Sequence, residues 1–112
     1  MSSDRLTQLL DFLKNSPGDA FILFAIAKEY EGLGNQEQAL KHYLELAEKQ
    51  PDYVGTYYHL GKLYEKQGAF EKAFSTYKTG MQVAKKMGDQ HSLSELAGAK
   101  LNLGEEEDFE EA

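Results

Sequence analysis

Chemistry in this chain would have to come from three histidines and from the acidic and hydroxyl side chains near one of them. The histidines lack the His-x-x-x-His spacing by which one helix face holds a zinc ion: they are His42, His59 and His91. His91 and Glu95 are four residues apart and could hold a metal weakly, although this spacing more often gives a hydrogen bond on a helix surface. The sequence predicts no metal site and no cofactor.

A catalytic nucleophile is no better supported. Ser92 and Ser94 lie beside His91, but the strained turn and the orienting carboxylate that activate a serine are missing around them. The chain has no cysteine, and the Gly-x-Gly at residues 32–34 reads as a turn between helices, not as the strand-to-helix turn that binds phosphate. We therefore predict that the protein is not an enzyme.

The elements that would position these side chains all read as helices. Apolar residues recur at helical spacing, and no usable stretch alternates apolar and polar residues as a strand does. Pro51 is expected to end one helix, Gly68 to form a left-handed turn and Asp89 to cap the last helix. The fold class is predicted to be all-α, with about six antiparallel helices at residues 3–14, 20–32, 36–49, 54–66, 70–87 and 90–103.

An internal repeat of 34 residues organises these helices. Residues 20–53 and 54–87 align without a gap at seven identical positions, where composition alone gives roughly two. A unit of this length cannot bury its own apolar face and has to stack on a neighbour. Function is therefore to be sought on a surface.

The repeat resembles the tetratricopeptide repeat. The first copy carries the pattern as Leu23, Ile26, Ala27, Tyr30, Ala39, Tyr43 and Pro51. The second carries it as Tyr57, Leu60, Gly61, Tyr64, Ala73 and Tyr77, with Lys85 in place of the proline. The resemblance implies an α-α superhelix of two stacked hairpins with a helix on each side, which binds proteins without catalysis. The small and tyrosine positions are expected to be packing residues of the core.

Residues on the inner helices that face away from the packing stripe are the candidate binding residues. Phe24 and Lys28 recur as Tyr58 and Lys62 one repeat later. An aromatic pair beside a lysine pair describes a concave face that could hold a peptide or helix with apolar and acidic groups. The predicted partner-binding residues are Phe21, Phe24, Lys28, Tyr58, His59 and Lys62.

Two alternatives stay open at this point. Phe21 and Phe24 could instead pack on the first helix, with the lysines forming ordinary surface ion pairs such as Lys28 with Glu31. The protein could also be a small self-associating scaffold, for example a homodimer, if apolar residues of the end helices such as Leu101 and Leu103 remain exposed.

Charge and composition bound the remaining function classes. The net charge is −7, and residues 105–112 carry six of the 19 acidic side chains, which leaves 13 acidic against 12 basic residues elsewhere. Neither part has the basic stripe that nucleic acid binding needs, and no apolar run is long enough to span a membrane. We expect a cytoplasmic protein with one domain at residues 1–104 and an acidic, disordered tail at 105–112. That tail could alternatively dock on the aromatic and lysine groove through Phe109.

Overall fold

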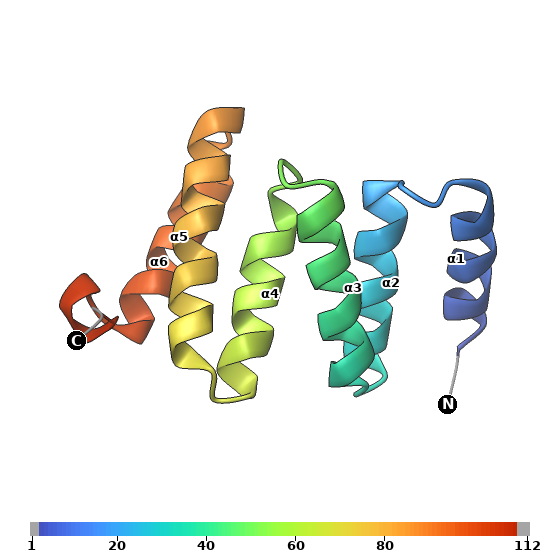
Figure 1. Cartoon of the computed structure of the whole chain (residues 1–112), viewed down its shortest axis with the longest axis horizontal. Coiled ribbons are helices and arrows are strands. Elements are labelled where there is room, and N and C mark those ends of the chain that lie inside the picture. Colours follow the sequence, from blue (N-terminus) through green and yellow to red (C-terminus); the bar gives the residue numbers. More distant parts are fainter. Residues whose placement is uncertain (1–2, 110–112) are drawn as a thin grey trace. The chain divides into compact units, whose positions relative to one another are not determined.

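A computed structural model describes residues 3–109 of the chain and shows six α-helices and one short 3-10 helix there, with no strand among these residues (Figure 1). The prediction of an all-α fold is confirmed. The elements are α1 (Asp4–Asn15), α2 (Ala20–Gly32), α3 (Gln36–Lys49), α4 (Gly55–Lys66), α5 (Phe70–Met87), α6 (Gln90–Leu103) and η1 (Glu106–Phe109). Four of the six predicted helices have the predicted bounds, and the other two differ by one residue.

The chain divides into two compact units, Met1–Tyr53 and Val54–Ala112, called unit 1 and unit 2 below. The division falls at the same residue as the predicted repeat boundary, although we expected a single domain. Unit 1 contains α1, α2 and α3, and unit 2 contains α4, α5, α6 and η1. Each unit is described in its own right.

Side-chain caps and turns fix where the helices begin and end. Ser3, Asp19, Asn35 and Asp89 each accept a hydrogen bond from a backbone N–H in the first turn of the following helix. Such a cap satisfies one of the donors that a helix start leaves unpaired. Gly68 has φ of 74°, so the predicted left-handed turn after α4 is confirmed.

In unit 1, α2 packs on both α1 and α3. Leu6 and Leu9 of α1 are buried against Ala25 and Ile26 of α2. These two leucines lie on the packing face of α1, whereas the neighbouring Phe12 is 57% exposed.

In unit 2, α5 packs on both α4 and α6. Close approach depends on two glycines. A Cβ at Gly61 would lie 2.2 Å from the Tyr77 ring, and a Cβ at Gly80 would lie 2.5 Å from Cβ of Tyr57 and 3.1 Å from Leu96. Real Cβ atoms do not approach other atoms this closely, so only glycine lets the three helices pack as they do.

The same buried tyrosine joins the two helices of each hairpin. Tyr43 and Tyr77 are fully buried, and their hydroxyls donate hydrogen bonds to Glu31 and Glu65, which lie 12 residues earlier in each unit. Burial, followed by the hydrogen bond to glutamate, raises the pKa of both tyrosines well above the ordinary value. These signature residues are packing residues, as predicted from the sequence.

The acidic tail differs from the sequence expectation. Residues 106–109 form η1, and Phe109 stacks on Phe74 of α5 with ring centroids 4.3 Å apart. The structure thus gives residues 105–109, for which we expected disorder, contacts with α5 and α6 through this stack and through ion pairs of Glu106 with Lys78 and Lys100. Residues 110–112 of that predicted tail lie outside the described residues.

Candidate functional site

In unit 1, the predicted binding residues gather on one side of α2. Lys28 lies one turn after Phe24, and its Nζ is 5.7 Å from the centroid of the Phe24 ring. Phe24 is half-buried, and its ring lies 6.2 Å from that of Tyr43 and 5.5 Å from that of Tyr53. Two aromatic neighbours of Phe24 thus come from α3 and from the loop after it.

A hollow of about 330 Å³ adjoins this pair. It is lined by Arg5, Phe21, Phe24, Ala25, Lys28 and Glu29. Phe21 is 65% exposed. Glu29 is held from α1 by the side chains of Arg5, at 3.3 Å, and of Ser3, at 3.0 Å. These contacts occupy Glu29, so the cationic groups Arg5 and Lys28 give the hollow a basic character beside an exposed aromatic ring.

In unit 2, α4 carries the equivalent pair with nearly the same geometry. Lys62 Nζ is 5.5 Å from the centroid of the Tyr58 ring. Lys62 also forms an ion pair with Glu65, with 3.8 Å between Nζ and Oε2. His59 meets the Tyr58 ring edge to face, with centroids 5.7 Å apart. A lysine one turn after a half-buried aromatic residue is therefore a feature of both units.

A second hollow, of about 300 Å³, lies between α4 and α6. Its lining includes two of the predicted residues: it consists of Val54, Gly55, Tyr58, His59, Ser92, Glu95 and Leu96. Lys62 does not line this hollow, but its Nζ lies over the ring of Tyr58, which does. The structure thus brings Phe21, Phe24 and Lys28 together in unit 1, and Tyr58, His59 and Lys62 together in unit 2. Their role in binding stays a prediction.

Two residues considered for catalysis or metal binding, Ser92 and His91, contact carboxylates at the start of α6. The hydroxyl of Ser92 donates to Asp89 at 2.8 Å, and its backbone N–H donates to the same carboxylate at 3.0 Å. These two hydrogen bonds hold the pKa of Asp89 below its ordinary range and fix the start of α6. His91 Nε2 lies 3.7 Å from Glu95 at the surface of α6. Within residues 3–109, no three His, Cys, Asp or Glu side chains are placed to hold a metal ion.

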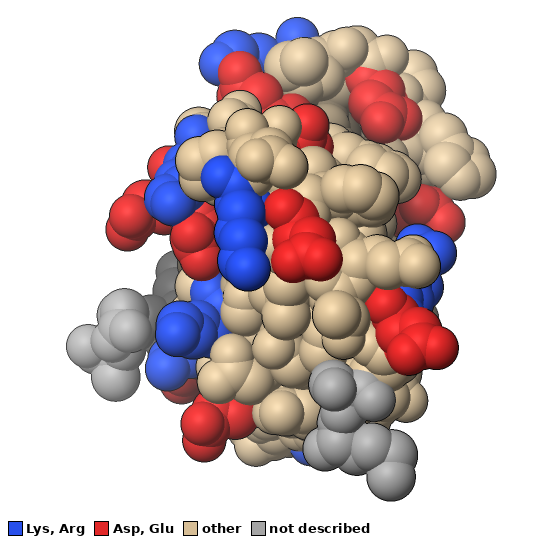
Figure 2. Space-filling view, turned by 90° about the vertical axis from the view of Figure 1, so that its right-hand side faces the viewer, with Lys and Arg blue, Asp and Glu red and all other residues tan. Residues whose placement is uncertain are grey.

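Surface charge bears on nucleic acids as partners, and the length and composition of the helices bear on membranes. On the face drawn in Figure 2, basic and acidic side chains are interspersed, so this face has no continuous basic area for a phosphate backbone. None of the helices in the described part of the chain is both long and apolar enough to cross a bilayer.

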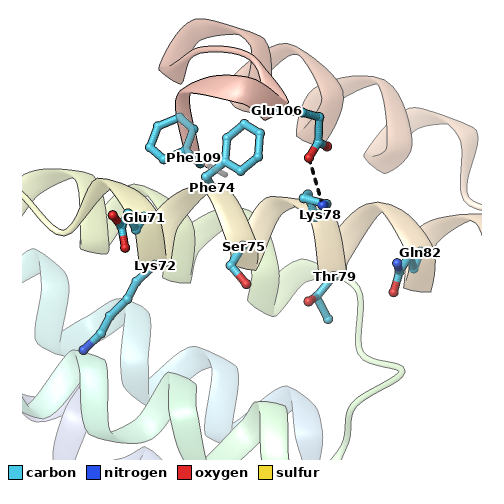
Figure 3. A pocket seen from close by; sticks show the side chains of 9 residues that line it. All are labelled: Glu71, Lys72, Phe74, Ser75, Lys78, Thr79, Gln82, Glu106 and Phe109. Carbon is cyan, nitrogen blue, oxygen red and sulfur yellow. Dashed lines mark hydrogen bonds and ion pairs between the residues drawn. The ribbon is translucent and has the colours of Figure 1, made fainter. Parts of the chain in front are cut away.

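A further site, which the sequence did not indicate, lies on α5 and α6 of unit 2. Phe74 of α5 contacts Phe109, and Lys78 of α5 contacts Glu106 (Figure 3). Lys100 of α6 forms an ion pair with Glu106, and its Nζ lies over the Phe74 ring. The sequence signal that could have found the site is an aromatic residue inside the acidic tail, but nothing in the sequence shows which surface it contacts.

Comparisons with known proteins agree with the repeat. The profile described as "TPR repeat" matches residues 27–68, and the profile described as "Tetratricopeptide repeat" matches residues 54–89. A search among curated proteins finds no match to the chain.

Solved structures of tetratricopeptide repeat domains are also similar. A crystal structure of such a domain from Salinibacter ruber is 48% identical, with 76% of this chain and 96% of that chain covered and a TM-score of 0.74. A solution structure of such a domain from the same organism is 46% identical, with 86% and 94% covered and a TM-score of 0.75. A protein of Bordetella parapertussis, 24% identical with 92% and 89% covered and a TM-score of 0.74, supports the fold alone.

Proposed function

The chain belongs to the tetratricopeptide repeat family, whose repeats generally mediate protein–protein interactions, and from this we propose that it is a noncatalytic module that binds a peptide or a helix of a partner protein. The binding residues would be the aromatic–lysine pairs, defined as Phe24 with Lys28 on α2 and Tyr58 with Lys62 on α4. Each unit then supplies one subsite.

One observation carries the proposal: the pair has the same geometry in both units. The lysine Nζ lies 5.7 Å from the ring centroid in unit 1 and 5.5 Å in unit 2, and the aromatic ring of each pair lines a hollow. The buried tyrosine–glutamate pair already joins the helices of each hairpin, so packing does not require the exposed cation. Repetition of a partly exposed pair beside a hollow supports a role in recognition.

The chemistry of the pairs supports a partner with apolar and acidic side chains. Burial of apolar area against Phe24 and Tyr58 would supply most of the affinity, since aromatic side chains are the common anchors of protein interfaces. Lys28 and Lys62 would add charge complementarity, which acts more on selectivity and association rate than on affinity. We therefore propose an acidic peptide or helix with at least one apolar anchor.

Selection from a random peptide library against the purified native chain tests this proposal. We expect enriched peptides in which a carboxylate stands near an apolar side chain. Phe24→Ala and Tyr58→Ala should each weaken binding of an enriched peptide at least tenfold with unchanged helix content, because removing an anchor typically costs 1 to 2 kcal/mol or more.

Charge reversal provides matched controls in both units. Lys28→Glu and Lys62→Glu should turn the selection away from acidic peptides, whereas Lys41→Glu on α3 and Lys66→Glu at the end of α4 should leave it unchanged. All four variants change the net charge equally. Peptides that bind the two aromatic variants as tightly as the native chain would contradict the proposal.

Self-association is the second candidate function. It is favoured by two large apolar side chains that remain exposed in the structure, Phe12 on α1 at 57% and Leu101 on α6 at 66%. Contiguous exposed apolar patches mark contact surfaces, and under this second candidate each of the two side chains would belong to such a patch. Sedimentation of the native chain and of Phe12→Ser and Leu101→Ser variants distinguishes the candidates: a concentration-dependent mass that falls in these variants supports a homodimer.

A further inference from the structure

The tail of unit 2 is held first by an aromatic stack. The rings of Phe109 and Phe74 lie nearly parallel, 4.3 Å between centroids and 18° between planes, and they face each other in Figure 3. Lys100 Nζ lies 4.8 Å from the centroid of the Phe74 ring. The Phe74 ring, with the Lys100 cation beside it, can therefore stack with the aromatic side chain of a bound segment.

A carboxylate three residues before Phe109 adds a second contact. Glu106 lies 3.0 Å from Lys78 Nζ and 3.6 Å from Lys100 Nζ. The side chain of Lys100 is only 17% exposed while that of Glu106 is 62% exposed. The two lysines belong to the helices α5 and α6, whereas Glu106 belongs to the short segment after Gly104. A carboxylate of another segment could therefore take the place of Glu106 while the lysines stay in position.

The chain turns back onto α5 at Gly104. Its φ of 149° and ψ of −165° lie in a region that only glycine adopts readily. The Glu105 N–H then donates to Asp108 at 2.8 Å, which closes the turn. The tail thereby presents Glu106 and Phe109 on the same side, at the spacing Glu-x-x-Phe.

The surface is larger and more basic than the tail requires. A hollow of about 530 Å³ is lined by α5 together with Glu106 and Phe109, and a neighbouring one of about 260 Å³ includes Lys85 as well as Lys78 and Lys100. Glu106 is the acidic residue that lines the second hollow beside three lysines. Exposed ion pairs contribute little stability, so a ligand with more carboxylates has room and charge to compete.

We propose that this surface, Phe74, Lys78 and Lys100, is a second protein-binding site that accepts acidic segments of the form Glu-x-x-Phe, and that the chain's own tail covers it until a partner segment displaces the tail. This site lies on α5 and α6 and uses none of the aromatic–lysine pairs, so it is independent of the function proposed above. The tail acts as an internal competitor, because tethering raises its effective concentration to the millimolar range.

The test uses the full chain and a capped peptide with the sequence of residues 104–109, Gly-Glu-Glu-Glu-Asp-Phe. Phe109→Ala in the chain removes the competing ring, and Glu106→Gln serves as a second release variant. In NMR titrations we expect the peptide to shift the amides around Phe74, Lys78 and Lys100 in both release variants. Its apparent affinity for the native chain should be about tenfold weaker, because the tethered tail competes.

Controls separate this site from general charge attraction. In the Phe109→Ala background, Lys78→Glu should weaken peptide binding about fivefold or more while Lys66→Glu, with the same charge change, should not. A peptide with alanine in place of phenylalanine should also bind more weakly. Equal affinity for native and release variants would overturn the proposal, as would peptide-induced shifts confined to Lys28, Tyr58 and Lys62. If the native chain instead dimerises by exchanging tails, the site binds a second copy of this chain, and the proposal of a partner segment from another protein is overturned.

Discussion

One position in the second helix of the hairpin is Leu46 in unit 1 and Gly80 in unit 2, one repeat later. Leu46 is fully buried and fills its own position. At Gly80, the space that a side chain would take is occupied by Tyr57 from α4 and Leu96 from α6. In unit 1 a leucine side chain fills this position. In unit 2 the glycine has no side chain, and α6 packs against α5 there.

Other equivalent positions are alike. The buried tyrosine, its glutamate partner and the aromatic–lysine pair occur in both units with nearly the same geometry. The comparison shows two kinds of position. At some, contacts within the hairpin determine the residue type; at others, the residue type depends on which further helix or segment packs on the hairpin. In unit 2 that additional structure is α6 and the tail.

The largest expected effect comes from giving unit 2 the residue of unit 1. Gly80→Leu places a side chain where even a Cβ would lie 2.5 Å from Tyr57 of α4 and 3.1 Å from Leu96 of α6, so both helices have to shift away from α5. We expect a loss of about 3 kcal/mol in the free energy of unfolding, near the upper end for overpacked cores, and reduced hydrogen-exchange protection in α6. Urea unfolding and amide exchange measure the two effects.

Gly98→Ala is the matched control for that substitution. It lies in α6, and a Cβ there meets nothing within 4 Å. Alanine should therefore raise stability by up to about 1 kcal/mol, the difference in helix propensity. If Gly80→Leu kept native stability and native protection in α6, the role given to Gly80 would be wrong.

Removing one hydroxyl tests whether the units are alike where they share residues. Tyr43→Phe and Tyr77→Phe delete the hydrogen bonds to Glu31 and Glu65. Each should cost about 1.5 kcal/mol, a usual value for a hydrogen bond to a charged group. The two losses, measured by urea unfolding, should agree within about 0.5 kcal/mol. Unequal losses would show that the tyrosines contribute differently in the two units.

The same tyrosines give a pH dependence with a definite sign. Burial raises the pKa of both groups in the folded chain, while the unfolded chain titrates near about 10. Their contribution is therefore complete below pH ~10 and is lost as the pH rises above it. The loss of stability between neutral and alkaline pH should be smaller in the phenylalanine variants than in the native chain, and an unchanged slope would contradict this assignment.

The sequence predicts those features of the structure that depend on residues close together in the chain. Helix bounds, the Asp89 cap and the Gly68 turn depend on neighbouring residues, and these predictions were confirmed. The aromatic–lysine pairs could be found because residues four apart share a helix face. Docking of the tail through Phe109 was one of the sequence alternatives, but the surface that Phe109 contacts could not be found, because Phe74 lies far from it in the sequence.

Gly104 tests the part of unit 2 that has no counterpart in unit 1. Gly104→Ala forces a backbone conformation that costs about 1 to 3 kcal/mol in other residues, and its Cβ would also lie 3.2 Å from the Phe109 ring. This strain exceeds the contribution of one stack, so the tail should leave Phe74 with little change elsewhere. Loss of the ring-current shifts at Phe74 and Lys100, with Glu105→Gln as the control, would report its release.

The smallest expected effect concerns the lysines of the two aromatic–lysine pairs. Lys28→Gln should cost about 0.5 kcal/mol, the value of an exposed cation–π contact. Lys62→Gln should cost slightly more, by no more than about 0.5 kcal/mol, since it also loses the ion pair with Glu65. Adding salt should shrink the extra cost in unit 2 and leave the cost in unit 1 nearly unchanged. Urea unfolding at low and high salt measures this difference. A cost above about 1 kcal/mol for either lysine would exceed the usual range for such exposed contacts, and would show that the lysine holds the hairpin together and is not reserved for a partner.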